Sequence, residues 1–274
     1  MKPGIHDIPM KEYLQLAAFS SGIAHKALTY SPYHARFDQE HGSGEGSSEA
    51  DIGTAIHDIL LEGRNRIVAV DAPDWRTKAA KEERDAARAE GKIPLLAHKV
   101  EAIEAAVASA RAHIERSEIA GIFNSAGPER TIVWNDEGVL CKARADWLSD
   151  QWHLSVKTTD GSANPAAYTR VKMGQNGHDT ALAFYKRGME AHGIQVEHRI
   201  IVIEQNPPYA CCVFGLAPDR WDLAERRAAR AIALWRIAEQ TGRFPAYPLE
   251  TCFAEANPWE MEAEEMARLE QEAS

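Results

Sequence analysis

Residues 139–159 read VLCKARADWLSDQWHLSVKTT, and this stretch decides the expected fold. Its two halves, residues 139–148 and 152–158, are apolar and β-branched enough for strands, and the second alternates with a period of two. The intervening Ser-Asp-Gln at 149–151 is typical of a turn. The sequence therefore predicts two consecutive strands joined by a short connection.

The polar residues of this hairpin suggest a site. Side chains two positions apart share one face of a strand, so Ser155 and Lys157 point the same way and Asp146 can meet them from the neighbouring strand. A carboxylate and an ammonium group on one sheet face can together hold a divalent cation and a phosphate. An ordinary hairpin with exposed charges has the same pattern, and spacing alone does not separate the two interpretations.

Further elements are expected on both sides of the hairpin. A strand over Glu129–Trp134 precedes it through a turn at Asn135–Gly138, which makes three antiparallel strands in succession. Later strands are expected at residues 197–204 and 209–216. Helices are predicted by apolar periodicity and capping residues at 20–28, 51–63, 74–91, 98–117, 164–172, 178–192, 219–240 and 260–274.

This order predicts an α/β (α+β) protein with a mixed central β-sheet flanked by helices. We expect a single domain over residues 1–274, in which 1–120 is a mainly helical elaboration and 129–250 supplies the core sheet and its helices. A Gly- and Ser-rich loop is expected over His41–Ser48.

Composition narrows the class of protein. The chain has 274 residues, of which 45% are hydrophobic and 26% charged, as in ordinary globular proteins. No apolar run is long enough for a membrane span, and the first ten residues lack the apolar region of a secretory signal, so we expect a cytoplasmic protein without a membrane segment.

Charge and cysteine content allow further alternatives. The net charge of −10 argues against a broad non-specific nucleic-acid surface, although a local basic channel remains possible. Two helical sets could supply that channel or could form solvated faces: Lys78, Lys81, Arg84 and Arg88, and then Arg220, Arg226, Arg227 and Arg230. The four cysteines are expected to stay reduced, and an iron–sulfur ligand set is the alternative: Cys141, Cys211, Cys212 and Cys252.

Five segments, read in order, carry a resemblance to a known family. They are GTAIHDILLEG, PERTIVW, CKARADWL, LSVKTT and HDTALAFYKRG, and the resemblance around them runs over most of the chain, from about Tyr13 to Tyr247. Together they resemble the PD-(D/E)XK nuclease superfamily, and more narrowly the phage-type exonucleases related to exodeoxyribonuclease VIII. The resemblance implies a restriction-endonuclease-like core with an N-terminal helical elaboration. It also implies a Mg²⁺- or Mn²⁺-dependent DNA exonuclease for phage or prophage recombination or DNA-end processing.

The resemblance also implies roles for individual residues. Hydrolysis of a phosphodiester uses divalent cations, and Mg²⁺ prefers oxygen ligands. Asp146 would be the central ligand, with Glu129, His57 and the backbone carbonyl of Val156 as further ligands. Lys157 would act with Asp146 and Glu129 in catalysis. Contacts to the DNA backbone would come from Thr158, Thr159 and Tyr185. Double-stranded DNA with a free end would be the substrate, and a homo-oligomer and a single-strand annealing protein would be possible partners.

Two positions depart from the family pattern. Where the family has Asp or Glu two residues before the lysine, this chain has Ser155, and where it has Gln four residues before the tyrosine, this chain has Ala181. A hydroxyl is a poorer Mg²⁺ ligand than a carboxylate. Either a nearby acid, Asp160 or Asp179, substitutes, or the chain is a weakened or inactive nuclease-fold protein that binds DNA. Besides an active nuclease and an inactive DNA-binding protein, a third hypothesis is an α/β protein-interaction domain unrelated to DNA.

Overall fold

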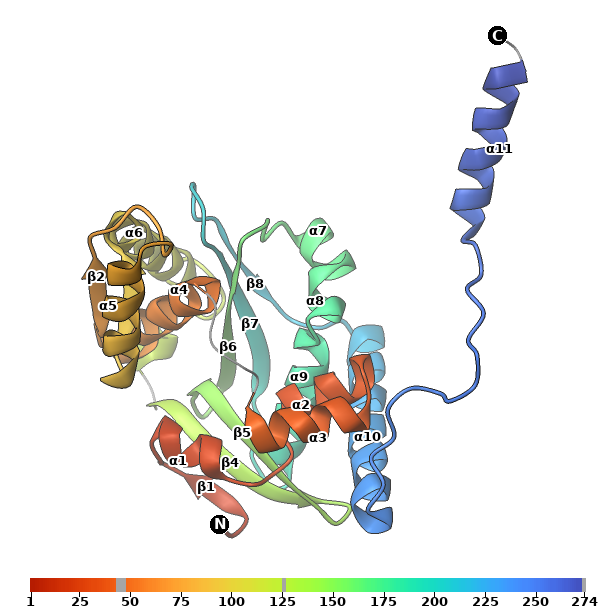
Figure 1. Cartoon of the computed structure of the whole chain (residues 1–274). Helices are drawn as coiled ribbons and strands as arrows, with labels where there is room; N and C mark the ends of the chain where they lie inside the picture. Colours follow the sequence, from red (N-terminus) through yellow and green to blue (C-terminus); the bar gives the residue numbers. More distant parts are fainter. Residues whose placement is uncertain (43–47, 125–126, 273–274) are drawn as a thin grey trace.

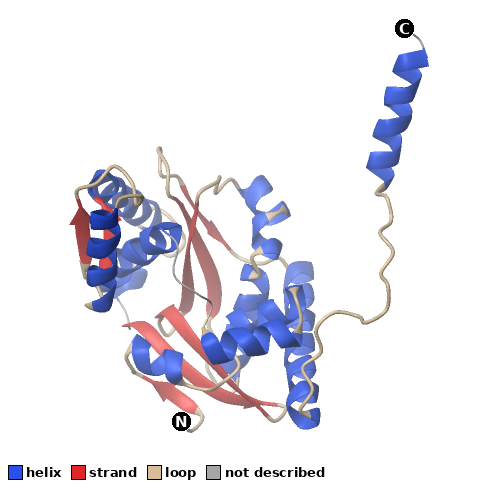
Figure 2. Cartoon of the chain, viewed as in Figure 1, coloured by secondary structure: helices blue, strands red, loops and turns tan. Residues whose placement is uncertain are grey.

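The computed structural model describes residues 1–42, 48–124 and 127–272. Its central feature is a six-stranded sheet, which Figures 1 and 2 show between helices. The strand order is β1-β4-β5-β6-β7-β8, and β6 and β7 are parallel while the other neighbours are antiparallel. The predicted mixed sheet is thus confirmed. Its strands are β1 (Gly4–His6), β4 (Gly127–Asp136), β5 (Val139–Leu148), β6 (Trp152–Thr159), β7 (Glu197–Glu204) and β8 (Cys211–Phe214).

The β4–β5 hairpin closes with a tighter turn than expected. The strands pair up to Asp136 and Val139, so the connection is only the two residues Glu137 and Gly138. Both have positive φ, 51° and 91°, which is the conformation that two-residue hairpins need and that Gly adopts without strain. The Asn135 side chain accepts a hydrogen bond from the Gly138 N–H at 2.8 Å, which stabilises the turn.

The next pair of strands separates soon after its turn. β5 and β6 pair only at Trp147 with Leu154 and at Leu148 with His153, while β6 pairs along its whole length with β7. Beyond the turn, the edges of β5 and β6 are therefore free to bind something other than each other. The candidate site lies at this opening.

Helices cover both faces of the sheet. On one face, α2 (Ser21–Thr29), α3 (Pro32–His41), α9 (His178–Glu190) and α10 (Pro218–Thr241) pack around buried aromatic rings, with Trp134 and Phe184 edge to face at 4.9 Å. On the other face, α4 (Ser48–His57) and α6 (Ala97–Ile114) cover β6 and β7. In β7, Ile201 and Ile203 contact one helical layer, and Ile200 and Val202 pack in a separate buried cluster. Such a continuous apolar strand is typical of a sheet covered on both sides.

The N-terminal part contains strands that the sequence pattern did not predict. β1 joins the edge of the main sheet, and β2 (Ile67–Val70) and β3 (Ile93–Leu96) form a separate parallel pair beside α5 (Lys78–Ala89). These strands are three or four residues long, too short to show a clear period. Residues 1–120 are therefore mainly helical, but they also contain the short strands β1, β2 and β3.

Several helix boundaries differ from the expected ones. Asp51 is not a helix cap, because α4 begins at Ser48, and the Asp51 side chain pairs with Arg88 at 2.7 Å. Asp219 also lies inside its helix, because Pro218 occupies the first turn of α10. The helix expected at 164–172 is divided into α7 (Pro165–Arg170) and α8 (Lys172–Gln175). The loop expected over His41–Ser48 falls mostly on residues 43–47, outside the described residues.

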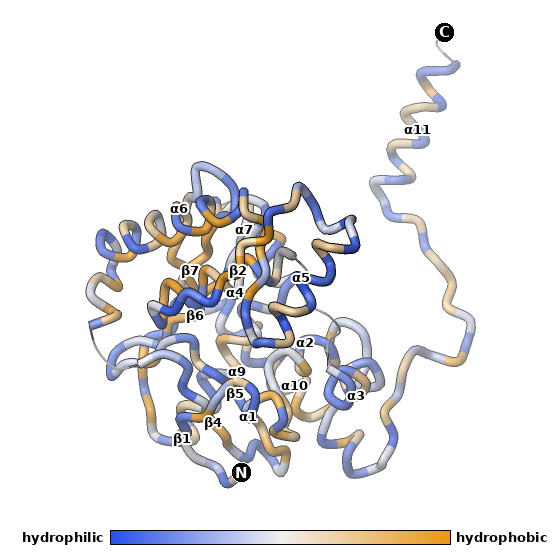
Figure 3. Tube along the Cα trace, turned by 60° about the vertical axis from the view of Figure 1, so that its left-hand side comes forward, coloured by the Kyte–Doolittle hydropathy of each residue, from blue (hydrophilic) through white to orange (hydrophobic). Residues whose placement is uncertain are grey.

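The remaining elements lie at the periphery. The short helix α1 (Met10–Gln15) borders the candidate site, and a 3₁₀ turn spans Ile122–Asn124. The C-terminal helix α11 (Pro258–Glu272) extends away from the rest of the chain, as Figure 3 shows, and none of its residues is buried. No helix within the described ranges is both long and apolar enough to cross a bilayer.

Candidate metal centre

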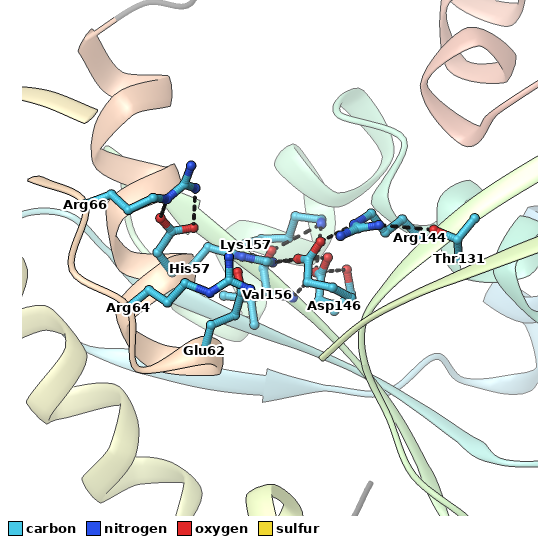
Figure 4. A network of polar contacts seen from close by, with 12 residues as sticks. His57, Glu62, Arg64, Arg66, Thr131, Arg144, Asp146, Val156 and Lys157 are labelled. Atoms are coloured by element: carbon cyan, nitrogen blue, oxygen red, sulfur yellow. Dashed lines mark hydrogen bonds and ion pairs between the residues drawn. The ribbon is translucent and has the colours of Figure 1, made fainter. Parts of the chain in front are cut away.

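Three elements far apart in the chain bring an imidazole and two carboxylates together. His57 ends α4, Glu129 lies near the start of β4, and Asp146 lies near the end of β5. Their ligand-type atoms all lie within 4.8 Å of one another, and Figure 4 shows the surrounding polar contacts. The structure thus places side by side three residues that the sequence singled out. Imidazole nitrogen and carboxylate oxygen are both common ligands of divalent cations.

Asp146 is held by the strand that leaves its pairing. Its Oδ2 accepts hydrogen bonds from the backbone N–H of Val156 at 2.7 Å and from the Ser155 hydroxyl at 3.1 Å. Burial opposes the charge on Asp146, but Lys157, His57 and the Val156 N–H outweigh it and hold the pKa of this carboxyl well below its usual range. Asp146 is therefore ionised at neutral pH, with Oδ1 directed at His57 at 3.3 Å.

Glu129 is anchored in a similar way. Its Oε2 pairs with Arg144, and Oε1 lies 3.5 Å from Nε2 of His57. Arg144 is itself held by the carbonyl of Ile8 at 2.7 Å and by the hydroxyl of Thr131 at 3.1 Å. Glu129 also has a φ of 63°, which is uncommon for a residue other than glycine. Such unusual backbone conformations cluster at functional sites.

His57 owes its position to the approach of α4 to β6. A side chain at Gly53, one turn earlier, would begin 3.0 Å from the Thr158 hydroxyl, so glycine permits the close contact. After His57 the helix continues as one π-helical turn, Asp58–Glu62, a feature common at functional sites. Burial lowers the pKa of His57, but the hydrogen bond and charge of Asp146, with the charge of Glu129, raise it overall above its ordinary value.

Lys157 lies beside the carboxylate pair. Its Nζ is 3.7 Å from Oδ2 of Asp146 and donates a hydrogen bond to the carbonyl of Val156 at 3.1 Å. The Val156 carbonyl, expected as a metal ligand, is therefore in contact with this ammonium group. Cation binding by the Val156 carbonyl remains a prediction.

The acids considered as replacements at the Ser155 position are engaged elsewhere. Asp179 is completely buried and pairs with Arg220 at 2.7 Å and Arg227 at 3.4 Å. Asp160 is exposed and lies 3.8 Å from Lys172. Neither belongs to the three-residue group of His57, Glu129 and Asp146. Within the described residues, the position at which the family resemblance implies a second carboxylate is thus occupied only by the Ser155 hydroxyl.

The residues expected to touch DNA are divided. Thr158 and Tyr185 line the cleft around the centre. Thr158 accepts a hydrogen bond from the Gln205 side chain at 2.9 Å, and Tyr185 stacks on His153 with ring centroids 4.9 Å apart. The buried Thr159 instead accepts a hydrogen bond from the Gly161 N–H at 3.1 Å. Thr159 is therefore not part of the cleft lining, and the structure does not support the expected contact between Thr159 and DNA.

The cleft has a volume of about 1340 Å³ and is bordered by α1, α4 and strands β4 to β6. Its lining contains cations that the sequence reasoning missed: Arg64, Arg66, Arg130 and Arg144. Arg144 lies two positions before Asp146 on β5, so strand periodicity could have indicated it. Arg66 pairs with Asp58 through two contacts of 2.7 and 3.0 Å, which no local pattern indicates.

The basic helical sets and the cysteines do not form the sites considered for them. Most members of the basic sets pair with acids of this chain, as Arg88 does with Asp51 and Arg220 with Asp179. Cys141 is buried and Cys252 exposed, and in the part of the chain that the structure describes no cysteine belongs to a group of potential metal ligands.

Among solved structures, the chain is similar to the "Putative exonuclease" from Eubacterium rectale. The match has 10% sequence identity and a TM-score of 0.60, and it covers 94% of this chain and 99% of that one. At this identity the likeness shows a shared fold. Rai1 from Scheffersomyces stipitis, at 12% identity over 85% of this chain and 70% of that one, has a TM-score of 0.23, which is too low to carry an argument. No protein-family model and no curated protein matches the sequence.

Proposed function

We propose that this protein is a DNA exonuclease that uses Mg²⁺ or Mn²⁺ to hydrolyse phosphodiester bonds. One observation carries the proposal: each carboxylate has one oxygen anchored and the other directed at His57. Arg144 holds Glu129, and the Val156 N–H holds Asp146. The unanchored oxygens and the His57 nitrogen then form a ready donor set for one cation. The fold shared with a protein described as an exonuclease supports the same assignment.

The donor set suits a hard or borderline divalent cation. Two carboxylates are typical of Mg²⁺ and Mn²⁺ sites, and the imidazole of His57 makes Mn²⁺ the better match. When bound, the cation polarises the phosphate and lowers the pKa of the attacking water. The chain's own residues would then position the substrate. The Lys157 ammonium group, beside the centre, would stabilise charge on the phosphate, and Thr158 and Tyr185 would contact the neighbouring backbone.

The distribution of charge is compatible with DNA binding. Residues 249–274 contain eight glutamates and one arginine, so this segment carries −7 of the net −10. The rest of the chain is therefore close to neutral. Arg64 and Arg130, in the lining of the cleft, have side chains that are 63% and 40% exposed. Cations so placed can contact phosphates although the whole protein is acidic.

The proposal extends to biological context through the family resemblance alone. A phage-type exonuclease related to exodeoxyribonuclease VIII would process double-stranded DNA ends in recombination, with a single-strand annealing protein as its partner. We further propose that the whole chain forms one nuclease domain, with residues 129–250 as its core and 1–120 as its elaboration.

A second candidate function is DNA binding without turnover. It is favoured by Ser155, whose hydroxyl donates to Asp146 where a second carboxylate is usual, and by the engagement of Asp160 and Asp179 in other ion pairs. With fewer charged ligands, the site should hold a cation weakly. Both functions would use the same cleft, and they differ in whether the bound DNA is hydrolysed.

The test compares linear and closed circular duplex DNA with Mn²⁺, Mg²⁺ or chelator. An exonuclease should shorten only the linear DNA, in the presence of metal, and Asp146→Asn should abolish the activity. Calorimetry with Mn²⁺ should show binding that Asp146→Asn removes. Metal and DNA binding without turnover would select the second function. Absence of both Mn²⁺ and DNA binding would contradict both.

A further inference from the structure

The segment from Leu249 to Glu272 exposes apolar side chains that a monomer leaves in water. The exposed fractions are 101% for Leu249 and 88% for Phe253 in the linker, and 66% for Trp259 and 55% for Met266 in α11. Figures 1 and 3 both show α11 apart from the rest of the chain. Exposed apolar groups gathered in one segment commonly mark an interaction site.

α11 has the pattern of a docking helix. Trp259, Ala263, Met266 and Leu269 follow one another at i, i+4, i+7 and i+10, so they share one face. The other positions are mostly glutamates, six in the helix against one arginine. A partner surface should therefore combine apolar side chains with arginine or lysine.

The outward face of α10 has this complementary chemistry. Its exposed positions Arg226, Arg230, Leu234 and Ile237 follow at i, i+4, i+8 and i+11, while the opposite face is buried through Ala224, Ala228, Ala231 and Trp235. Ile237 is 54% and Leu234 37% exposed. One half of this stripe is basic and the other apolar, and in the described part of the chain its four side chains are exposed, as those of α11 are.

We propose that α11 of one copy docks on the outward face of α10 in a second copy, and that two copies exchange their helices. A 15-residue helix docked on one stripe buries on the order of 1,000 Å², below the standard stable interface of roughly 1,600 Å². Two reciprocal contacts in a two-fold dimer exceed that size. The 16 residues from Gly242 to Asn257 can extend to roughly 50 Å, which is long enough to reach a neighbouring molecule.

The segment from Leu249 to Glu272, called the arm below, can be altered without disturbing the fold. Among the described residues, the buried clusters and the side chains packed against them end at Phe244. The wild-type chain should sediment as a dimer, and Trp259→Glu with Met266→Glu should weaken dimerisation at least tenfold. The matched control is Met261→Glu, an exposed position on the opposite side of α11, which should leave the dimer intact.

The acceptor face is tested with Arg226→Glu and Arg230→Glu, which should also give monomers. Arg76→Glu with Lys78→Glu is the control, since both side chains are 91% exposed and lie outside α10 and α11. The decisive step mixes the α10 double variant, which keeps its arm, with a chain ending at Pro248, which keeps its acceptor face. The mixture should form a heterodimer at 100 µM, held by one contact and therefore weaker than the wild-type dimer, although neither component dimerises alone.

Three results would overturn the proposal. One is a wild-type chain that remains monomeric at 100 µM, whether its α11 is free or docked on its own α10. Another is a dimer that survives the Trp259 and Met266 substitutions. The third is a mixture in which no heterodimer forms at 100 µM while the wild type is dimeric at the same concentration.

Discussion

At the scale of single residues, the centre depends on groups that hold the carboxylate side chains in place. Arg144 and the Val156 N–H each bind one oxygen of a carboxylate and leave the other available. Such anchoring fixes the rotamers of the ligands before a cation arrives, which lowers the entropic cost of binding. Ser155 takes part as a hydrogen-bond donor to Asp146.

Ser155→Asp should convert that donor into a ligand. The new carboxylate would lie about where the hydroxyl now meets Asp146 at 3.1 Å, so the metal-free protein should lose on the order of 1–3 kcal/mol through repulsion. Mn²⁺ affinity and nuclease turnover should rise about ten- to a hundredfold, equal to about 1.4–2.7 kcal/mol. Calorimetry, thermal melts with and without Mn²⁺, and end-labelled DNA measure the three effects.

Ser155→Asn is the matched control, because it has the shape of aspartate without the charge and should give no gain in affinity. Asp146→Ala in the Ser155→Asp background should remove the gain. If Ser155→Asp bound Mn²⁺ no better than the wild type, the assignment of this strand face to metal binding would be wrong.

A pair of buried histidines should make the fold sensitive to acid. Nδ1 of His153 lies 3.0 Å from Nδ1 of His198, and burial lowers the pKa of His153 to about 3 and of His198 to about 4. Below pH 6.5 these two histidines bind protons in the unfolded chain but remain neutral in the folded chain. The free energy of unfolding is therefore intact above pH 6.5 and falls toward pH 4, by about 1.4 kcal/mol per pH unit for each histidine.

His153→Gln should reduce this slope by one proton or more in denaturant titrations between pH 7 and pH 5. Exposed His98→Gln is the control and should keep the wild-type slope. An unchanged slope in His153→Gln would show that other groups cause the loss of stability in acid.

At the scale of elements, the separation of β5 from β6 creates the site, and the helices on the opposite face hold the strands in place. Trp134 of β4 packs on Phe184 of α9, and α9 also carries Tyr185 into the cleft. The two helical layers therefore contribute differently: α4 provides His57, while α9 and α10 support the sheet from behind and α9 adds Tyr185 to the cleft lining.

At Gly188, α9 approaches β4 closely. A Cβ there would lie 2.7 to 3.0 Å from three ring atoms of Trp134. Although alanine is normally favoured over glycine in a helix by about 1 kcal/mol, Gly188→Ala should destabilise the protein by about 1–3 kcal/mol through overpacking. Exposed Gly22→Ala in α2 meets only the Ser20 hydroxyl at 4.0 Å and should be neutral or stabilising. Urea unfolding of both variants measures the difference, and equal stabilities would contradict this packing.

At the scale of the whole molecule, charge is distributed unevenly. The C-terminal segment holds most of the net negative charge, whereas the cleft contains arginines beside its acidic centre. The acidic segment and the cleft are thus separate surfaces. Their separation is compatible with both proposals, DNA binding in the cleft and docking of the acidic C-terminal segment on a protein surface.

Binding of duplex DNA should weaken steeply with salt, because bound phosphates release counterions. Arg64→Ala and Arg130→Ala should each weaken binding and reduce the slope of log Kd against log salt by about 0.9. Arg76→Ala, at an exposed site that does not line the cleft, is the control and should leave the slope unchanged. Fluorescence anisotropy with end-labelled duplex measures the slopes, and slopes identical in all variants would exclude this cleft as the DNA surface.

The sequence by itself determined the three-strand order of the sheet's centre and which residues share a strand face, because alternation along a strand is a local property. It thereby predicted the grouping of Asp146, Ser155 and Lys157. Only the tertiary structure decided that Arg144 anchors Glu129, that Asp179 is used by two arginines, and that β1 joins the sheet. These contacts join residues far apart in the chain, and their partners are selected by packing and charge in three dimensions, which no local period encodes.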